Sequence, residues 1–268
     1  MLRKLLKHEF RATARVMGPL FLVILVLALG ANLSIRFMLD ADSFIPNLLG
    51  GLLMMAFVIG MTGLIIMSIV LMVNRFRTNL MGDEGYVMFT LPASSHQLVW
   101  SKIIVSTVWF IATGIVECAA LLICAADLDL IQEIFSSDFF FRVSQVIQEL
   151  VQEYGLNLPV MALELIVLCL VGCAVLCLEF YAAMAVGHSF ANHKMALSVV
   201  FFFGFQFVMQ LAGGLILNSN GLWESFYYLD GMESFHQMMG ISIVISLVTG
   251  VIYYFITSTM LKKRLNLQ

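Results

Sequence analysis

The sequence contains six apolar runs, each long enough to cross the hydrocarbon core of a bilayer. They cover residues 18–39, 46–73, 99–126, 159–187, 195–217 and 239–261. A helix rises about 1.5 Å per residue, so roughly 20 residues cross a core about 30 Å thick. Backbone N–H and C=O groups find no water there, and the runs lack the alternation of polar and apolar residues that barrel strands need. The sequence therefore predicts an all-α integral membrane protein, a single transmembrane domain with six spans.

The composition also indicates a protein that lies mainly in the hydrocarbon of a bilayer, since 61% of residues are apolar and only 12% are charged. The five cysteines all lie within predicted spans and do not form an extracellular disulfide framework. Cys169, Cys173 and Cys177 follow one helical stripe, which is compatible with a soft-metal path. Small reduced side chains that pack between helices are the favoured interpretation, and no metal site is predicted.

Prolines and a capping sequence place several helix starts. Pro19, Pro46 and Pro159 are expected to open helices, where a missing N–H costs nothing. Ser94 and Gln97 have the spacing of a capping box, with Ser94 as the N-cap of the third span.

Charge sets the expected orientation. Twelve of the 14 Lys and Arg residues lie in the segments assigned to the cytoplasm, together with three acidic residues, whereas the outer connections hold eleven acidic residues and two Arg. Basic residues favour the cytoplasmic side of a membrane. Both chain termini are therefore expected in the cytoplasm.

Three extramembrane segments have a pattern of their own. Residues 1–17 alternate apolar and basic faces, which predicts an amphipathic elbow helix on an anionic leaflet, with a simple positive-inside anchor as the alternative. Residues 127–158 predict an outer amphipathic helix on the bundle rim or the membrane interface. Residues 218–237 are rich in aromatic side chains and form either an interfacial belt or a re-entrant hairpin.

Polar side chains inside the spans are the candidates for an intramembrane site. Ionised groups in hydrocarbon are costly, so they are expected to face a bundle interior, a cavity or a partner. Two hypotheses remain open: a substrate or proton pathway, and hydrogen bonds between helices with protonated carboxyls. Arg36, at the outer end of the first span, has a depth compatible with pairing to Glu164. The candidates are Glu117, Glu164, Glu179, Gln206 and Gln210.

No catalytic motif is present in the sequence. A P-loop ends in Gly-Lys, and the chain contains no Gly-Lys dipeptide. It also lacks the Gly-x-Ser-x-Gly elbow of hydrolases. The chain is therefore expected to have no ATPase site and no enzymatic activity of its own.

Two short motifs carry a resemblance to a known family. Asp83-Glu84-Gly85-Tyr86, followed by Phe89-Thr90-Leu91-Pro92-Ala93-Ser94 and Ser101-Lys102, resembles the connection between the second and third spans of ABC-2-type ABC transporter permeases of Gram-positive bacteria. The basic amphipathic segment at residues 2–10 is similar to the opening of the same family.

This resemblance implies a permease subunit of an exporter in the bacterial cytoplasmic membrane. A second permease subunit, identical or different, would complete the pathway. Separate ATP-binding subunits would hold ATP and magnesium. Membrane lipid is also an expected partner, and nucleic acid is not expected to bind. The connection between spans 2 and 3 would supply a cytoplasmic coupling helix. The alternative is a transporter, channel or assembly factor without ATP coupling that uses the intramembrane glutamates. The implied ATPase contacts are Phe76, Arg77, Asp83, Glu84, Gly85, Tyr86 and Phe89.

Overall fold

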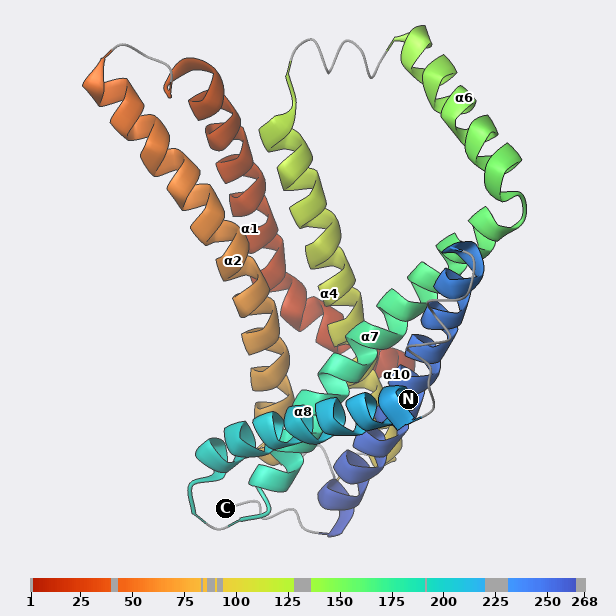
Figure 1. The fold of residues 1–268 in the computed structure, drawn as a ribbon. Helices are drawn as coiled ribbons and strands as arrows, with labels where there is room; N and C mark the ends of the chain where they lie inside the picture. The colour runs from red at the N-terminus through yellow and green to blue at the C-terminus, as the bar shows by residue number, and fades with distance from the viewer. Residues whose placement is uncertain are drawn as a thin grey trace. The chain divides into compact units, whose positions relative to one another are not determined.

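The computed structural model describes residues 2–39, 43–82, 84–85, 90, 94–127, 136–190, 192–219 and 231–263. Within these ranges the regular structure is helical (Figure 1). Six helices are long and apolar enough to cross a membrane, and the seventh, α6, is not among them. The predicted six-span, all-helical membrane protein is confirmed at this level. The helices are α1 Leu2–Phe37, α2 Phe44–Met81, α4 Ser95–Ala125, α6 Ser137–Tyr154, α7 Asn157–Gly187, α8 Lys194–Ser219 and α10 Gly231–Lys263.

The first helix is longer than predicted. The expected elbow at residues 1–17 is not a separate element, because α1 runs unbroken from Leu2 to Phe37. Pro19 lies inside this helix, so the prediction that it opens a helix is wrong. The Leu, Lys, Arg and Ala residues before it are strong helix formers, and proline is tolerated within long membrane helices at the loss of one backbone bond. Pro46 and Pro159 lie in the first turns of α2 and α7, as expected.

The second helix also extends past its predicted end at residue 73. It continues to Met81, so Phe76 and Arg77 lie on the same helix as the span that precedes them. Much of the segment predicted to supply the coupling helix is therefore the end of α2, while Asp83, Tyr86 and Phe89 lie outside the described ranges. The next helix begins as predicted, since Ser94 Oγ accepts the N–H of Gln97 at 3.3 Å.

The chain forms two compact units. The first unit comprises Met1–Glu9, Met72–Thr107 and Pro159–Gln268, and the second comprises Phe10–Leu71 and Val108–Leu158. Helices α1, α2 and α4 contribute to both.

A narrow apolar stripe on α1 forms the core of the second unit. Residues recurring at helical spacing lie on one face of a helix and pack against its neighbours. The buried cluster joins this stripe to α2 and α4, and its members are Met17, Ile24, Ala28, Ala31, Phe57, Leu64 and Ala120.

Polar side chains of α1 cap the end of α4 in the second unit. The Asn32 amide donates to the carbonyls of Ile123 and Cys124, each at 3.0 Å, and of Ala126 at 2.6 Å. The Arg36 guanidinium also donates to the carbonyl of Ala126. These donors satisfy helix-end carbonyls that have no partner within α4. The sequence allowed a pairing of Arg36 with Glu164, whereas the structure gives the Arg36 guanidinium the Ala126 carbonyl as its partner.

In the first unit, the C-terminal half of α7 is the central buried element. Tyr181 and Ala182 are fully buried, and Ala183 is 2% exposed. Gly187 lies directly against the start of α8, where an added Cβ would be 2.2 Å from Ser198 Oγ and 2.5 Å from its backbone N. Only glycine permits this close approach of the two helices.

Outward-facing positions on the long helices are apolar. Leu122, Phe203 and Phe255 are each at least 65% exposed, in the company of many other large apolar side chains. Such a surface is unfavourable in water and matches a hydrocarbon environment.

The amphipathic helix predicted within residues 127–158 is present as α6, and its placement on the outer side stays a prediction. Ser136 caps it by accepting the N–H of Phe139 at 3.1 Å. Its apolar residues remain exposed, including Phe140 at 64% and Phe141 at 63%. The aromatic-rich outer loop falls mainly on residues 220–230, outside the described ranges, while residues 231–237 already belong to α10.

Candidate functional site

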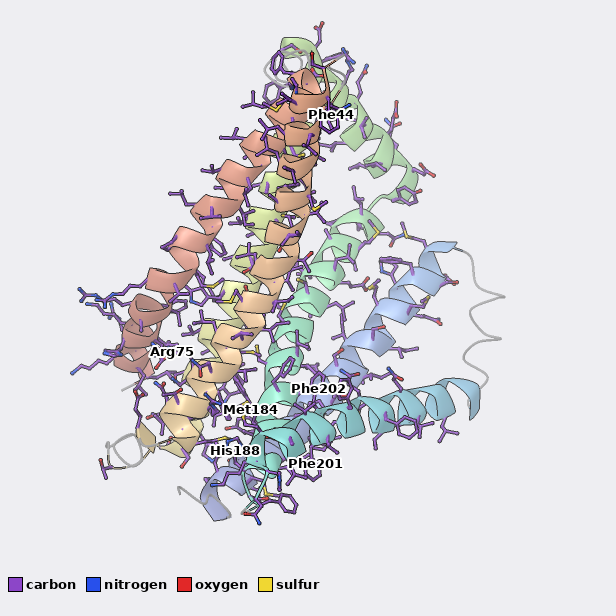
Figure 2. The ribbon with its side chains drawn as sticks, turned by 90° about the vertical axis from the view of Figure 1, so that its left-hand side faces the viewer. Phe44, Arg75, Met184, His188, Phe201 and Phe202 are labelled. Carbon is purple, nitrogen blue, oxygen red and sulfur yellow. The ribbon has the colours of Figure 1, made fainter. Side chains whose placement is uncertain are left out.

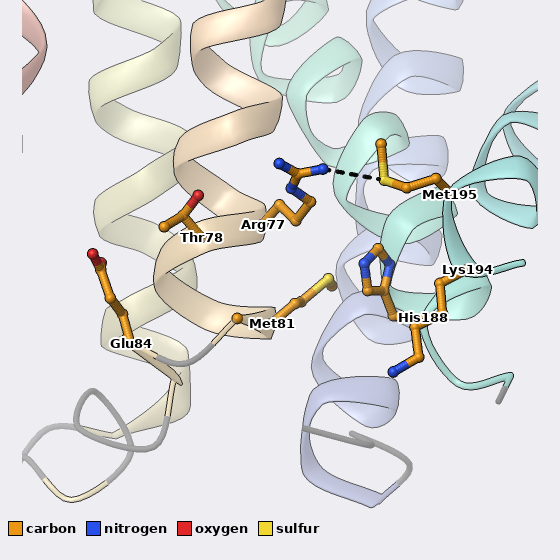
Figure 3. Close-up of a pocket in the computed structure, with 8 residues that line it drawn as sticks. Arg77, Thr78, Met81, Glu84, His188, Lys194 and Met195 are labelled. Atoms are coloured by element: carbon orange, nitrogen blue, oxygen red, sulfur yellow. Dashed lines mark hydrogen bonds between the residues drawn. The ribbon is translucent and has the colours of Figure 1, made fainter. Parts of the chain in front are cut away.

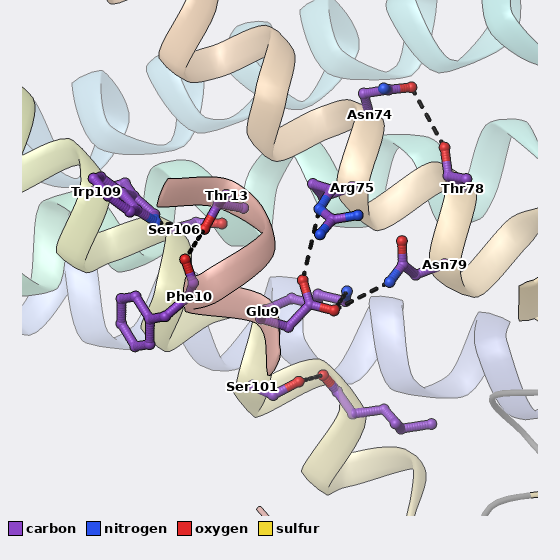
Figure 4. Close-up of polar contacts among 12 residues, drawn as sticks. Glu9, Phe10, Thr13, Asn74, Arg75, Thr78, Asn79, Ser101, Ser106 and Trp109 are labelled. Atoms are coloured by element: carbon purple, nitrogen blue, oxygen red, sulfur yellow. Dashed lines mark hydrogen bonds and ion pairs between the residues drawn. The ribbon is translucent and has the colours of Figure 1, made fainter. Parts of the chain in front are cut away.

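A buried charge cluster joins three helices of the first unit. Glu9 Oε1 of α1 lies 2.6 Å from Lys102 Nζ of α4. The side chain of Glu9 is 4% exposed and that of Lys102 is 3% exposed. From α2, Asn79 Nδ2 donates to Glu9 Oε1 at 3.1 Å and Arg75 Nε lies 3.9 Å from Glu9 Oε2. Figure 4 shows Arg75 and Asn79, one turn apart on α2, both directed at Glu9.

Helical geometry explains why these groups meet. Arg75 and Asn79 are four residues apart, so they share a face of α2. Glu9 lies at helical spacing from Leu2 and Leu5, on the apolar face of the first helix rather than its basic face. Buried charges are costly unless paired, and here a carboxylate between two cations meets that requirement.

Sequence reasoning missed this cluster. Glu9 and Lys102 entered as charges on the expected cytoplasmic side and as members of the two resembling motifs, and they were not paired with each other. The signal that could have identified the site is the position of Glu9, since a carboxylate on the apolar face of an amphipathic helix needs a buried partner.

An aromatic stack ties α2 to α7 beside the cluster. The rings of Phe76 and Tyr181 have centroids 3.9 Å apart and are tilted by only 7°. The Tyr181 hydroxyl and Ser106 Oγ of α4 are 2.9 Å apart and share a hydrogen bond. Both aromatic side chains are fully buried. Phe76, expected at a partner contact, thus lies in the core of the first unit and offers no side-chain surface there.

A polar cavity of about 480 Å³ opens where the end of α2 meets the turn between α7 and α8. Arg77 approaches α8 with Nη1 3.6 Å from Met195 Sδ, and its Nη2 donates to Asn74 Oδ1 at 3.3 Å. Figure 3 shows His188 and Lys194 at one end of the cavity, Glu84 at the other, and Arg77 between them. The lining residues are Arg77, Thr78, Met81, Gly82, Glu84, His188, Lys194 and Met195.

The histidine in this cavity is held in its neutral form. Burial lowers the pKa of His188 below its ordinary value of 6.5, and the nearby Lys194 and Arg77 cations lower it further. A hydrogen bond of 3.0 Å between His188 Nδ1 and the Met184 carbonyl acts in the opposite direction but is outweighed. Near pH 7 the cavity therefore presents two cations, one carboxylate and a neutral imidazole.

Two of the predicted intramembrane carboxyls have side-chain partners within the first unit. Gln206 Nε2 donates to Glu179 Oε2 at 3.0 Å, which joins α7 to α8. His236 Nδ1 lies 2.8 Å from Glu164 Oε2, which joins α10 to α7. The second pairing was not predicted, because His236 had been placed in the outer loop.

Glu117 and Gln210 are the remaining intramembrane candidates. Glu117 belongs to the second unit, and within the described part of the chain its Oε1 atom is buried without a hydrogen-bond partner. Gln210, one turn beyond Gln206, has an exposed side chain. Among the described residues no three His, Cys, Asp or Glu side chains are placed to hold a metal ion.

The predicted ATPase contacts are only partly described. Glu84 is exposed, and Gly85 is buried with its N–H 2.8 Å from the Gly82 carbonyl. Asp83, Tyr86 and Phe89 lie outside the described residues.

Comparison with known proteins gives no match: no family model fits the chain, and neither a curated protein nor a solved structure is significantly similar to it. The functional argument therefore depends on the sequence motifs and on the geometry of the first unit.

Proposed function

We propose that this chain is the membrane-spanning permease subunit of an ATP-driven exporter in the bacterial cytoplasmic membrane. Two permease subunits would form the pathway, and separate ATP-binding subunits would hydrolyse ATP at its cytoplasmic side. The proposal is supported by six apolar helices and by the resemblance of residues 83–102 and 2–10 to ABC-2-type permeases.

The observation that carries the proposal is the rigid connection between the end of α2 and its neighbours. Helix α2 has no break before Met81. Its last turns are tied to α1 and α4 through Glu9 and Lys102, and to α7 through the stack of Phe76 on Tyr181. A force applied to the segment after Met81 would therefore move four helices together, whereas a flexible loop would absorb it.

The residues divide into two roles in this mechanism. The exposed Glu84, with Asp83, Tyr86 and Phe89 beside it in sequence, would contact the ATP-binding subunit. Phe76 would act inside the chain, transmitting displacement of α2 to α7.

One observation favours a second candidate function, a proton-linked transporter. The imidazole of His236 and the carboxyl of Glu164 form a titratable pair between two candidate spans. Paired ionisable groups at membrane depth are typical of proton relays. The Glu179 and Gln206 pair, in contrast, is the arrangement expected of hydrogen bonding between helices.

Affinity purification from native membranes in mild detergent tests the proposal. We expect the tagged chain to recover an ATP-binding subunit and ATPase activity, and Glu84→Lys to reduce that recovery through charge reversal at the contact. Glu233→Lys is the matched control, since Glu233 is also exposed but lies in a segment assigned to the opposite side of the membrane. Failure to recover any ATP-binding subunit with the unmodified chain would contradict the proposal.

A further inference from the structure

Two cavities that share one lining residue lie in the first unit, and the first has a charged lining whereas the second is almost wholly apolar. The polar cavity holds Arg77 and Lys194. The second, of about 270 Å³, lies between α7 and α8 and meets the first at Met195, which lines both. Figure 2 shows Met184 and Phe202 near His188, at the end of α7 where the chain turns into α8. Apart from Ser198 the second lining is apolar, and it comprises Val73, Phe180, Ala183, Met184, Met195, Ser198, Val199 and Phe202.

The polar cavity has the chemistry of a phosphate site. Arg77 and Lys194 supply cations from two different helices. The one carboxylate, Glu84, lies at the far end of the cavity. Its volume falls within the range of about 300–1,000 Å³ typical of ligand pockets.

The position of the two cavities relative to the membrane favours a lipid over a soluble anion. The end of α2 and the turn from α7 to α8 connect candidate spans, so the polar cavity lies at a membrane surface, level with lipid headgroups. The adjoining apolar cavity lies toward the hydrocarbon, and its wall includes Val199, whose side chain is 54% exposed. A soluble anion would leave this second cavity unfilled.

We propose that the joined cavities bind one anionic phospholipid, with its phosphate between Arg77 and Lys194 and an acyl chain between α7 and α8. The lipid comes from the leaflet at this surface, which is the cytoplasmic leaflet in the expected orientation. Arg77 then binds lipid rather than an ATP-binding subunit. This inference does not depend on ATP coupling, and it is tested on the purified chain alone.

Native mass spectrometry of the full chain in detergent, titrated with dioleoylphosphatidylglycerol or dioleoylphosphatidylcholine, measures the headgroup contribution. A basic residue near a membrane surface is worth roughly a factor of five in affinity for anionic lipid. We expect Arg77→Gln and Lys194→Gln each to weaken phosphatidylglycerol binding about fivefold and the double variant about 25-fold. Arg142→Gln, which removes one positive charge from an exposed position of α6 assigned to the outer side, is the control for the single variants and should leave this binding unchanged.

The acyl-chain contribution is tested by filling the apolar cavity. Val199→Trp should displace the chain and weaken phosphatidylglycerol binding at least fivefold. Val200→Trp should not, because the equally exposed Val200 does not line the cavity. The proposal would be overturned if both lipids bound equally or if the cavity and control variants had equal effects. It would also be overturned if inorganic phosphate or glycerophosphoglycerol competed fully with the lipid.

Discussion

The buried pair of Glu9 and Lys102 gives the sharpest quantitative prediction. Lys102→Met keeps an unbranched side chain, one atom shorter, and removes the cation, and Glu9→Met removes the carboxylate. The double variant replaces both charges with apolar side chains of similar size. Together with the unmodified chain, these variants form a double-mutant cycle across the contact between α1 and α4.

The structure sets the magnitudes. Removing one partner of a buried ion pair typically costs about 3–5 kcal/mol in the free energy of unfolding. The loss of free energy of unfolding in Lys102→Met should be near the lower limit, about 3 kcal/mol. The Glu9 carboxylate is still stabilised in this variant by Asn79 Nδ2, 3.1 Å from its Oε1, and by Arg75 Nε, 3.9 Å from its Oε2. Glu9→Met should approach about 5 kcal/mol, since it leaves Lys102 buried near Arg75 without a counter-charge.

The double variant should be more stable than either single variant. Replacing a buried ion pair by apolar groups is often nearly neutral, and the remaining loss is the Asn79 hydrogen bond, about 1 kcal/mol. The assay is titration with SDS in mixed micelles followed by circular dichroism. Lys7→Met on the exposed face of α1 is the control and should change the free energy by less than about 0.5 kcal/mol. If the double variant shows the sum of the two single losses, the pair does not act as a unit and the reasoning is wrong.

Three further predictions concern the first unit. Gly187→Ala should lower the free energy of unfolding by about 1–3 kcal/mol in the same titration, because the new Cβ would meet backbone atoms of α8. Gly172→Ala on the same helix is the control: its Cβ meets nothing within 4 Å, so the substitution should be neutral or stabilising. Equal effects of the two substitutions would contradict the close approach of α7 and α8. Tyr181→Phe should lower the free energy of unfolding by about 1 kcal/mol, because it removes one hydrogen bond and keeps the stack. Tyr181→Ala, which removes both, should lower it by about 3–5 kcal/mol. Equal losses from the two variants would show that the stack is not the main contact. Burial and the neighbouring cations lower the pKa of His188, so the imidazole takes up its proton only below its ordinary value of 6.5. Acidification should therefore strengthen phosphatidylglycerol binding below pH 6.5 and not above it, because the protonated imidazole adds a third positive charge beside the lipid phosphate. His188→Gln should abolish this increase and Glu84→Gln should retain it, and an unchanged pH dependence in His188→Gln would refute the role of the imidazole.

The number and order of the spans could be predicted because they depend on local properties of the sequence. Run length and apolarity identify a membrane helix without knowledge of its neighbours. The cap at Ser94 was predictable for the same reason, since it needs only residues one turn away. The end of α2 was not predictable in this way: Arg75 and Arg77 look like the start of a polar loop, but they extend the helix because Arg75 contacts a carboxylate on α1.

The candidate site required tertiary structure. Glu9 and Lys102 are far apart in sequence, and no local pattern pairs them. The same holds for His236 and Glu164, which meet only because α10 begins earlier than the apolar run indicated. Positions of buried polar groups in the sequence indicate that a partner is needed, but packing determines which partner it is.

Photo-crosslinking from position 84 tests the central proposal most directly. A photoreactive amino acid in place of the exposed Glu84 should give, in native membranes, an adduct with an ATP-binding subunit. The same amino acid in place of Phe141, exposed on α6 and assigned to the outer side, should give none. An ATP-binding subunit crosslinked from position 84 alone is the predicted result. Absence of that adduct, or an equal yield from position 141, would contradict the assignment of this chain as a permease driven by a separate ATPase.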